Sequence, residues 1–169
     1  MSSRRFSLAQ ANVAHMVAPL EDPVMDGFRT QLPRINALAD ASPGFVWRLQ
    51  SDAGDATSIR AFDDPLLLFN MSVWESLESL HAYVYKSEHV APLRARKQWF
   101  RLPAGPHLVL WWVAAGQLPS VGEALGKLEQ LRTHGPTAAA FTFRNPFPAP
   151  GTKPTRPPEV DAEFCVAAP

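Results

Sequence analysis

The sequence predicts one α+β domain with the ferredoxin-like order β-α-β-β-α-β, followed by a further helix and an edge strand. Three observations support this fold class. The chain has 169 residues, of which 46% are hydrophobic and 19% are charged, and this composition is typical of an ordered globular domain. Short apolar runs with the character of strands alternate with segments whose apolar residues recur at helical spacing. Residues 66–100 join an apolar strand directly to a helix that starts after a serine, and this segment contains most of the candidate site residues.

The predicted elements follow from local patterns along the chain. Strands are expected where apolar runs are short and bounded by turn residues, and helices where apolar residues recur every three or four positions. In chain order, the elements are a strand at 8–17, a helix from Pro23 to residue 41, strands at 45–50 and 66–74, a helix from 77 that Pro92 breaks, a short helix at 93–100, a strand at 107–114, a helix at 121–134 and a short edge strand at 139–144. Residues 51–65 hold four Asp residues and are expected to form a loop.

The first helix carries two proline signals. Pro23 suits the first helical turn, because a backbone N–H in that turn would have no acceptor within the helix. The residues expected to face inward are Val24, Phe28, Leu32, Ile35 and Leu38. Pro33 lies in the helix interior, where proline costs about 3 kcal/mol, so we expect a kink or a restart near residues 30–32. The triplet Ser42-Pro43-Gly44 is expected to end the helix.

The two later helices have clear start signals. Ser76 is a favourable N-cap, and Glu78 follows where the helix dipole favours a carboxylate. Ser120 and Glu123 have the spacing of a capping box. The last helix is expected to end at His134-Gly135-Pro136, since glycine and proline are typical just beyond a helix C-terminus. The strand before it is continuously apolar, which is typical of a strand covered on both faces.

The core domain is expected at residues 1–148, followed by an extended proline-rich tail at residues 149–169. Seven of the last 25 residues are proline. In a ferredoxin-like sheet the two crossover helices cover one face, and the bulky side chains of the other face also need cover. We therefore expect a homodimer, in which a second subunit supplies that cover.

The composition argues against several classes of partner. Lys plus Arg and Asp plus Glu both number 16, so no net charge attracts nucleic acid or an anionic membrane surface. No run approaches the roughly 20 apolar residues that span a bilayer. Cys165 is the single cysteine, which excludes an intrachain disulfide and fits a reducing, cytoplasmic compartment. The sequence has no glycine-rich phosphate-binding motif, so no nucleotide cofactor is expected.

The first candidate site is a row of polar residues across two strands. In the third strand, Asn70, Ser72 and Trp74 share one face, because side chains alternate between faces. Gln10 and Asn12 share a face of the first strand. These two strands are central neighbours in a ferredoxin-like sheet, so we expect a ligand cavity lined by Asn12, Asn70 and Trp74. The alternative is that the amides bond to one another or to water at a dimer interface.

Histidine supplies the predicted catalytic residue. His81 and His89 lie about two turns apart on one helix, which is too far for both to bind one metal ion. No metal site is therefore expected. His89, beside Ser87 and before Pro92, is the candidate for proton transfer or haem ligation. The alternative is that His89 is an ordinary surface or boundary residue.

Three further residues are predicted to contact a ligand. Arg48 is a lone charge in an apolar strand, and we expect it to pair with an acid of the 51–65 loop or to hold a ligand carboxylate. Tyr83 and Trp112 belong to a set of aromatic rings that either stack on a flat apolar ligand or fill the core. These rings, together with the polar row, predict a pocket for a small aromatic or apolar molecule.

Four stretches of the sequence resemble one bacterial family. They are 34–49 (RINALADASPGFVWRL), 70–89 (NMSVWESLESLHAYVYKSEH), 108–116 (LVLWWVAAG) and 134–147 (HGPTAAAFTFRNPF). Together they resemble the domain of unknown function 3291 family, from Leu8 to Pro148. That family is similar to the dimeric α+β-barrel superfamily, which includes antibiotic-biosynthesis monooxygenases and haem-degrading monooxygenases. The resemblance implies a homodimer whose two sheets face each other, with a pocket between each sheet and its own helices, and it implies no particular reaction.

The sequence thus predicts a protein that binds a small, flat, largely apolar molecule. As an enzyme it would be a cofactor-independent monooxygenase, isomerase or cyclase. The alternatives are a non-catalytic ligand-binding or stress-associated dimer, or a haem-binding protein. For haem, Asn12 resembles the first-strand asparagine of the haem-degrading relatives. However, Tyr83 and then Leu93 or Arg94 stand where those relatives have tryptophan and histidine, so no cofactor is expected.

Overall fold

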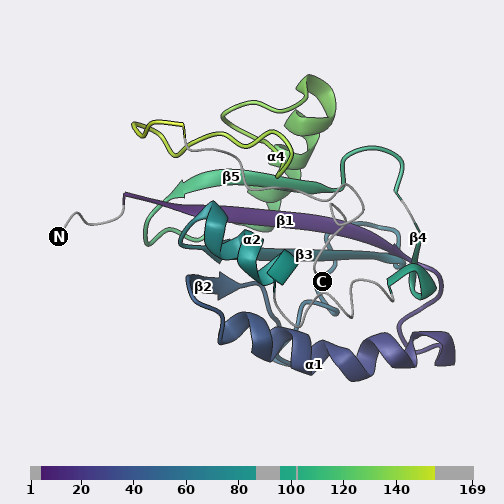
Figure 1. The fold of residues 1–169 in the computed structure, drawn as a ribbon. Coiled ribbons are helices and arrows are strands. Elements are labelled where there is room, and N and C mark those ends of the chain that lie inside the picture. The colour runs from purple at the N-terminus through teal and green to yellow at the C-terminus, as the bar shows by residue number, and fades with distance from the viewer. Residues whose placement is uncertain (1–4, 87–95, 102, 155–169) are drawn as a thin grey trace.

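The computed structural model describes residues 5–86, 96–101 and 103–154. Within these residues, five strands form one antiparallel sheet with helices on both faces (Figure 1). In chain order the elements are β1 (Phe6–Met16), η1 (Pro23–Met25), α1 (Asp26–Asp40), β2 (Phe45–Arg48), β3 (Leu67–Trp74), α2 (Leu77–Lys86), η2 (Arg96–Gln98), β4 (Phe100–Arg101), β5 (Leu108–Ala114) and α4 (Val121–His134). The longer elements confirm the predicted β-α-β-β-α-β order with an appended helix.

Strand β1 lies at the centre of the sheet. On one side it pairs with β3, which in turn pairs with β2, and on the other side it pairs with β5 and the short β4. Asn12 of β1 lies opposite both Asn70 of β3 and Leu108 of β5. Since side chains alternate along each strand, this register places Asn12 and Asn70 on one face. The predicted coincidence of the two polar faces is confirmed.

Helices α1 and α2 pack on this same face, called here the α1/α2 face (Figure 1). Two apolar clusters cover its two ends. The residues of the first cluster include Leu8, Trp74, Leu80, Tyr83, Leu108, Leu110, Phe141 and Phe143. Those of the second include Met16, Phe28, Leu32, Leu68 and Trp99. The polar row containing Asn12 and Asn70 lies between the two clusters.

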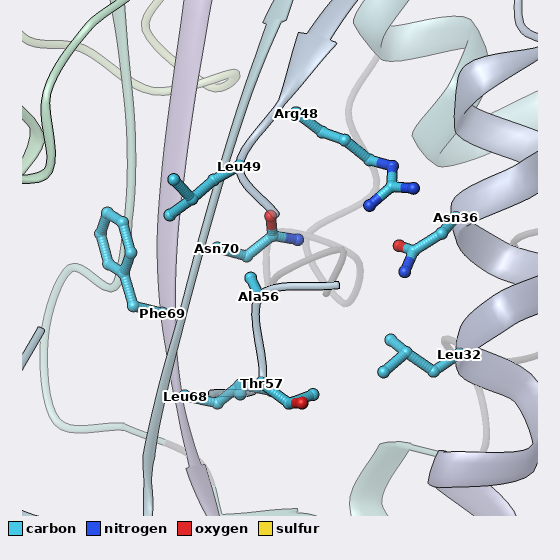
Figure 2. A pocket seen from close by; sticks show the side chains of 9 residues that line it. All are labelled: Leu32, Asn36, Arg48, Leu49, Ala56, Thr57, Leu68, Phe69 and Asn70. Atoms are coloured by element: carbon cyan, nitrogen blue, oxygen red, sulfur yellow. The ribbon is translucent and has the colours of Figure 1, made fainter. Parts of the chain in front are cut away.

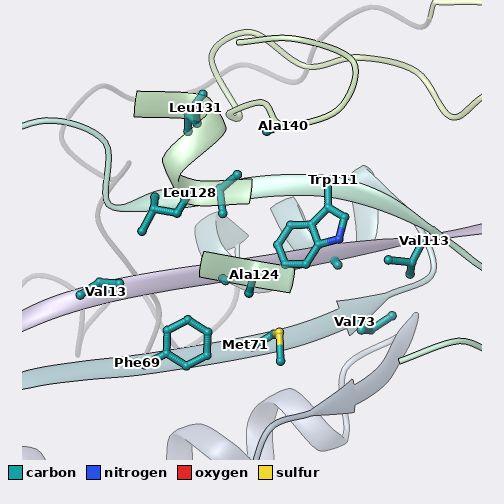
Figure 3. Packing of buried hydrophobic residues seen from close by; sticks show 13 residues of the cluster. Val13, Phe69, Met71, Val73, Trp111, Val113, Ala124, Leu128, Leu131 and Ala140 are labelled. Atoms are coloured by element: carbon teal, nitrogen blue, oxygen red, sulfur yellow. The ribbon is translucent and has the colours of Figure 1, made fainter. Parts of the chain in front are cut away.

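The opposite face, called here the α4 face, is covered within the same chain. Ala124, Leu128 and Leu131 of α4 are buried in one cluster with the sheet residues of this face (Figure 3). Phe69 and Trp111, which belong to β3 and β5, are each only 1% exposed. The expectation that a second subunit must cover this face is therefore wrong, because α4 folds back onto it. The homodimer stays a prediction, without this reason to support it.

Helix α1 differs in two ways from its prediction. It continues through Pro33 as one helix, instead of restarting near residues 30–32. Val24 does not face inward but is 50% exposed, because it belongs to the 3-10 turn η1, whose tighter winding shifts its side chain off the buried stripe. Asp22 caps this turn, since its carboxylate accepts a hydrogen bond from the Val24 backbone nitrogen at 3.0 Å.

The C-terminal part of the core domain differs from its prediction in one element. The expected edge strand at 139–144 is reduced to isolated bridges, one of which joins Phe141 to Leu110 of β5. Phe147 packs against the α1/α2 face. The start of the predicted tail, residues 149–154, is mostly exposed, and the rest of it lies outside the described residues, as do 93–95 of the predicted short helix.

Candidate functional site

Polar side chains form a row across the centre of the α1/α2 face. Gln10 Nε2 donates a hydrogen bond to Ser72 Oγ at 3.2 Å, and Trp74 Nε1 donates to the same oxygen at 2.9 Å. The register of β1 and β3 positions these groups, since Gln10 and Ser72 are direct partners. All three side chains are buried, and buried polar groups need such partners. The sequence placed Gln10 and Ser72 on this face but did not identify the network that they form with Trp74.

Asn12 is the next residue of β1 in this row, and its amide oxygen lacks a partner among the residues that the structure describes. The residue is 2% exposed, and Asn12 Oδ1 has no hydrogen-bond partner among the residues that the structure describes. A buried polar atom left in this state costs about 1–3 kcal/mol. Asn70, directly opposite on β3, is only partly buried. The centre of this face therefore holds one polar atom that a bound molecule could satisfy.

Arg48, the last residue of β2, is held by two partners. Its Nε and Nη2 atoms donate to the two carboxylate oxygens of Asp40 at 2.8 and 3.2 Å, and Nη1 donates to the Gly54 carbonyl at 2.7 Å. Of the two roles expected for Arg48, the pairing with an acid of the 51–65 loop is wrong, and the binding of a ligand carboxylate stays a prediction. The acid comes from the end of α1, and the loop contributes a backbone carbonyl. This two-point geometry orients the guanidinium group firmly.

Arg48 and Asn70 line a small pocket beside β3, at the end of β2 (Figure 2). Asn36 of α1 and Thr57 of the loop complete its polar lining, and the amides of Asn36 and Asn70 point toward the same space as the Arg48 guanidinium. The internal volume of about 20 Å³ is enough for one or two water molecules. The two predicted ligand residues thus meet here, but in a space too small for a ring system.

Trp112 lies in a different pocket from Asn70. That pocket has a volume of about 260 Å³ and lies between Trp112, the start of α2 and residues 146–154. The Trp112 indole nitrogen donates to the Phe147 carbonyl at 2.9 Å. In the pockets that described residues line, Trp112 and Asn70 are therefore apart.

Tyr83 packs beside Trp74 on the α1/α2 face. The two rings are stacked, with centroids 5.0 Å apart, and the Tyr83 hydroxyl donates to the Ile35 carbonyl at 3.3 Å. Burial raises the pKa of the Tyr83 phenol above its ordinary value, while Arg48 lowers this pKa and Asp40 raises it by smaller amounts. Tyr83 is therefore a neutral wall of the core at physiological pH and not a proton-transfer group.

The raised pKa of Tyr83 predicts a loss of stability at alkaline pH. Above about pH 10 the unfolded chain releases the phenol proton, whereas the folded protein keeps it, so the free energy of unfolding falls as pH rises. Below pH 10 the Tyr83 phenol makes its full contribution to the free energy of unfolding. Above pH 10 this contribution falls by up to about 1.4 kcal/mol per pH unit. Tyr83→Phe should reduce the slope measured by urea unfolding above pH 10, and Tyr85→Phe is the control. An equal slope in parent and Tyr83→Phe would contradict the assignment.

His89 lies outside the described residues, and so do Leu93 and Arg94, so the roles considered for them stay predictions. His81, earlier on α2, is buried in an aromatic cluster. Its ring centroid lies 4.5 Å from that of Tyr85 and 6.2 Å from that of Phe143. The helical spacing of the sequence could have indicated that His81 faces inward, because it follows the buried Leu80 by one position and precedes the buried Val84 by three.

The described residues contain neither a cluster suited to a metal ion nor a helix suited to crossing a membrane. No group of three or more His, Cys, Asp or Glu side chains is placed there to hold a metal ion. No helix in this part of the chain has both the length and the apolar character that a membrane crossing requires.

Several solved structures are similar to this chain at low sequence identity. SnoaB, a cofactor-independent oxygenase from Streptomyces nogalater, is 14% identical, and the match covers 66% of this chain and 95% of SnoaB with a TM-score of 0.42. PA3566 from Pseudomonas aeruginosa is 15% identical, with coverages of 70% and 99% and a TM-score of 0.39. NE2512, a protein of unknown function from Nitrosomonas europaea, is 17% identical, with coverages of 70% and 99% and a TM-score of 0.41.

The match to a protein family says more about this chain than the matches to solved structures. No curated protein matches the chain. One family model, described as a domain of unknown function (DUF3291), matches residues 7–157. This range includes nearly all of β1 and every later helix and strand, and it confirms the resemblance inferred from the four sequence stretches. The chain therefore belongs to the domain of unknown function 3291 family.

Proposed function

We propose that this protein binds a small, flat, largely apolar molecule on the α1/α2 face, between the sheet and its helices. The observation that carries this proposal is the buried Asn12 amide oxygen, which has no partner among the described residues. It lies between two apolar clusters, so it would orient one polar group of an otherwise apolar molecule. The stacked rings of Trp74 and Tyr83 supply flat walls on the same face.

We further propose that the bound molecule is isomerised or cyclised, or is oxygenated with molecular oxygen as the oxidant, without a metal or nucleotide cofactor. The polar groups of the row are amides, a hydroxyl and an indole, which are weak ligands for catalytic metals but good hydrogen-bond donors and acceptors. Asn12 and Asn70 would hold oxygen atoms of the substrate, and an amide N–H would stabilise negative charge that develops on one of them. We propose His89 as the proton-transfer residue. We also propose that the protein is a cytoplasmic homodimer.

Replacing Asn12 with leucine is expected to stabilise the ligand-free protein and to weaken ligand binding. Leucine is similar in shape to asparagine and needs no hydrogen bond, so the free energy of unfolding should rise by about 1–2 kcal/mol. The probe is N-phenyl-1-naphthylamine, a flat neutral fluorophore whose single N–H can donate to Asn12 Oδ1. Its affinity, measured by fluorescence titration, should fall about tenfold in Asn12→Leu. Urea unfolding of the ligand-free protein supplies the stability.

The matched control is Gln10→Leu, one step along the same row. The Gln10 amide already donates to Ser72, so its removal should not stabilise the protein. Only Asn12→Leu is therefore expected to combine a gain in stability with a loss of affinity. Equal effects of the two substitutions would show that Asn12 has no special role. A parent protein that binds no flat aromatic probe would overturn the proposed function itself.

A further inference from the structure

A pocket at the start of β5 has no role in the site described so far. Its volume is about 240 Å³, close to the lower end of the range for small-molecule sites. Leu108 and Phe143 form its apolar floor, and both are almost completely buried. His107, Thr142 and Arg144 supply polar groups around them. The pocket can thus take a flat apolar body and a polar substituent together.

This pocket adjoins the Asn12 position from the β5 side. Leu108 lines the pocket and is also the strand partner of Asn12 on the α1/α2 face. The His107 carbonyl accepts a hydrogen bond from the Val13 backbone nitrogen at 2.8 Å, which fixes the pocket against β1. Along the sheet, Leu108 therefore lies between this pocket and Asn12. The pocket beside Asn70, on the β3 side, has room for water alone.

Arg144 brings a positive charge to this pocket. Arg144 lines it and is exposed, and within the described ranges no carboxylate pairs with its guanidinium group. None of the described residues that line the pocket is Asp or Glu. An arginine in this position binds carboxylate, sulfonate or phenolate groups through charge-assisted hydrogen bonds. The lining is therefore complementary to an aromatic molecule that carries one negative charge.

We propose that the pocket at the start of β5 is the entrance to the Asn12 site, and that Arg144 selects aromatic molecules bearing an anionic group. This inference rests on the proposed function and adds the class of ligand and its route. The apolar body passes over Leu108 and Phe143 toward the polar row, and the anionic group stays at the mouth with Arg144. Arg144 is a specificity-determining residue and takes no part in bond making.

Two dyes of one skeleton test the inference. The anion 8-anilinonaphthalene-1-sulfonate and the neutral N-phenyl-1-naphthylamine share their rings and differ by the sulfonate group. In Arg144→Gln the affinity of the anionic dye should fall about tenfold, while that of the neutral dye changes less than about twofold. Arg60→Gln is the matched control, because it removes the same charge from the 51–65 loop and should change neither affinity. Leu108→Trp, which fills the floor, should weaken both dyes.

The outcomes separate the two proposals. If the neutral dye depends on Asn12 but the anionic dye binds Arg144→Gln as tightly as the parent, the selective role of Arg144 is wrong and the proposed function stands. If Arg144→Gln weakens the anionic dye but Asn12→Leu affects neither dye, the pocket is not an entrance to Asn12. If Leu108→Trp leaves both affinities unchanged, the route is wrong. If neither dye binds the parent protein, both proposals fall.

Discussion

Replacing Trp111 with alanine is expected to lower the free energy of unfolding by about 4 kcal/mol and to release α4 from the sheet. Trp111 is 1% exposed and lies in the cluster that joins β5 to Ala124 and Leu128 of α4 (Figure 3). Its indole nitrogen also donates to Glu123 Oε1 at 3.0 Å, in the first turn of that helix. Alanine removes the ring and this bond, and it leaves a cavity that the neighbouring strands cannot close. Urea unfolding gives the magnitude, and amide hydrogen exchange reports on α4.

The adjacent Trp112 provides the matched control for this prediction. It has the same side chain at the next position of β5, but it faces the α1/α2 side and is only partly buried. Trp112→Ala should therefore cost less than Trp111→Ala and should leave the protection of α4 unchanged. Trp111→Phe, which keeps an apolar ring and loses the bond to Glu123, should cost only about 1–2 kcal/mol. Equal losses in the two alanine variants would argue against α4 as the cover of this face.

Replacing Gly44 with alanine is expected to destabilise the protein by about 3 kcal/mol, through two separate costs. Gly44 has φ +80°, a conformation that costs an alanine about 1–2 kcal/mol. An added Cβ would also overlap the Ser79 hydroxyl and lie 2.6 Å from Ser79 Cβ, and such overpacking costs about 1–3 kcal/mol. The Gly44 carbonyl accepts a hydrogen bond from the Glu75 backbone nitrogen at 2.7 Å. The strain would therefore fall where the start of β2 lies beside the start of α2.

Gly54 allows the two costs to be separated. It has a similar φ of +88°, but an added Cβ would have no neighbour within 4 Å. Gly54→Ala should therefore show only the conformational cost, about 1 kcal/mol. The difference between the two variants measures the contact with α2, and Ser79→Gly should recover much of it in the Gly44→Ala background. If Gly44→Ala and Gly54→Ala destabilise equally, the close approach of Ser79 has no energetic effect.

The sequence predicted the parts of the site that depend on local periodicity. Alternation along a strand places Asn70 and Trp74 on one face, and the order of the elements makes β1 and β3 neighbours. Together these two rules predicted that Asn12 and Asn70 share a face, and the register confirms it. The helix starts at Ser76 and Ser120 were predicted equally well, because an N-cap acts on backbone groups only two or three residues away.

Contacts between distant segments were not predictable in the same way. Arg48 pairs with Asp40 and not with an acid of the loop, because the fold places the end of α1 within hydrogen-bond distance of the guanidinium group. Glu123 was assigned to a capping box, but its carboxylate accepts from Trp111 across the helix–sheet interface. Each choice depends on which of several acids the packing brings within about 3 Å, and sequence spacing does not contain that information.

The sequence by itself determined the α+β class, the order and approximate limits of the longer elements, and the polar row on the α1/α2 face. These features follow from residue type and short-range spacing. Only the tertiary structure decided that α4 covers the opposite face, that Asn12 Oδ1 is left without a described partner, and that a pocket with Arg144 lies beside Leu108. The physical reason is that burial and unsatisfied hydrogen bonds depend on how whole elements pack, and an amphipathic pattern gives a helix a buried side without specifying the surface against which it packs.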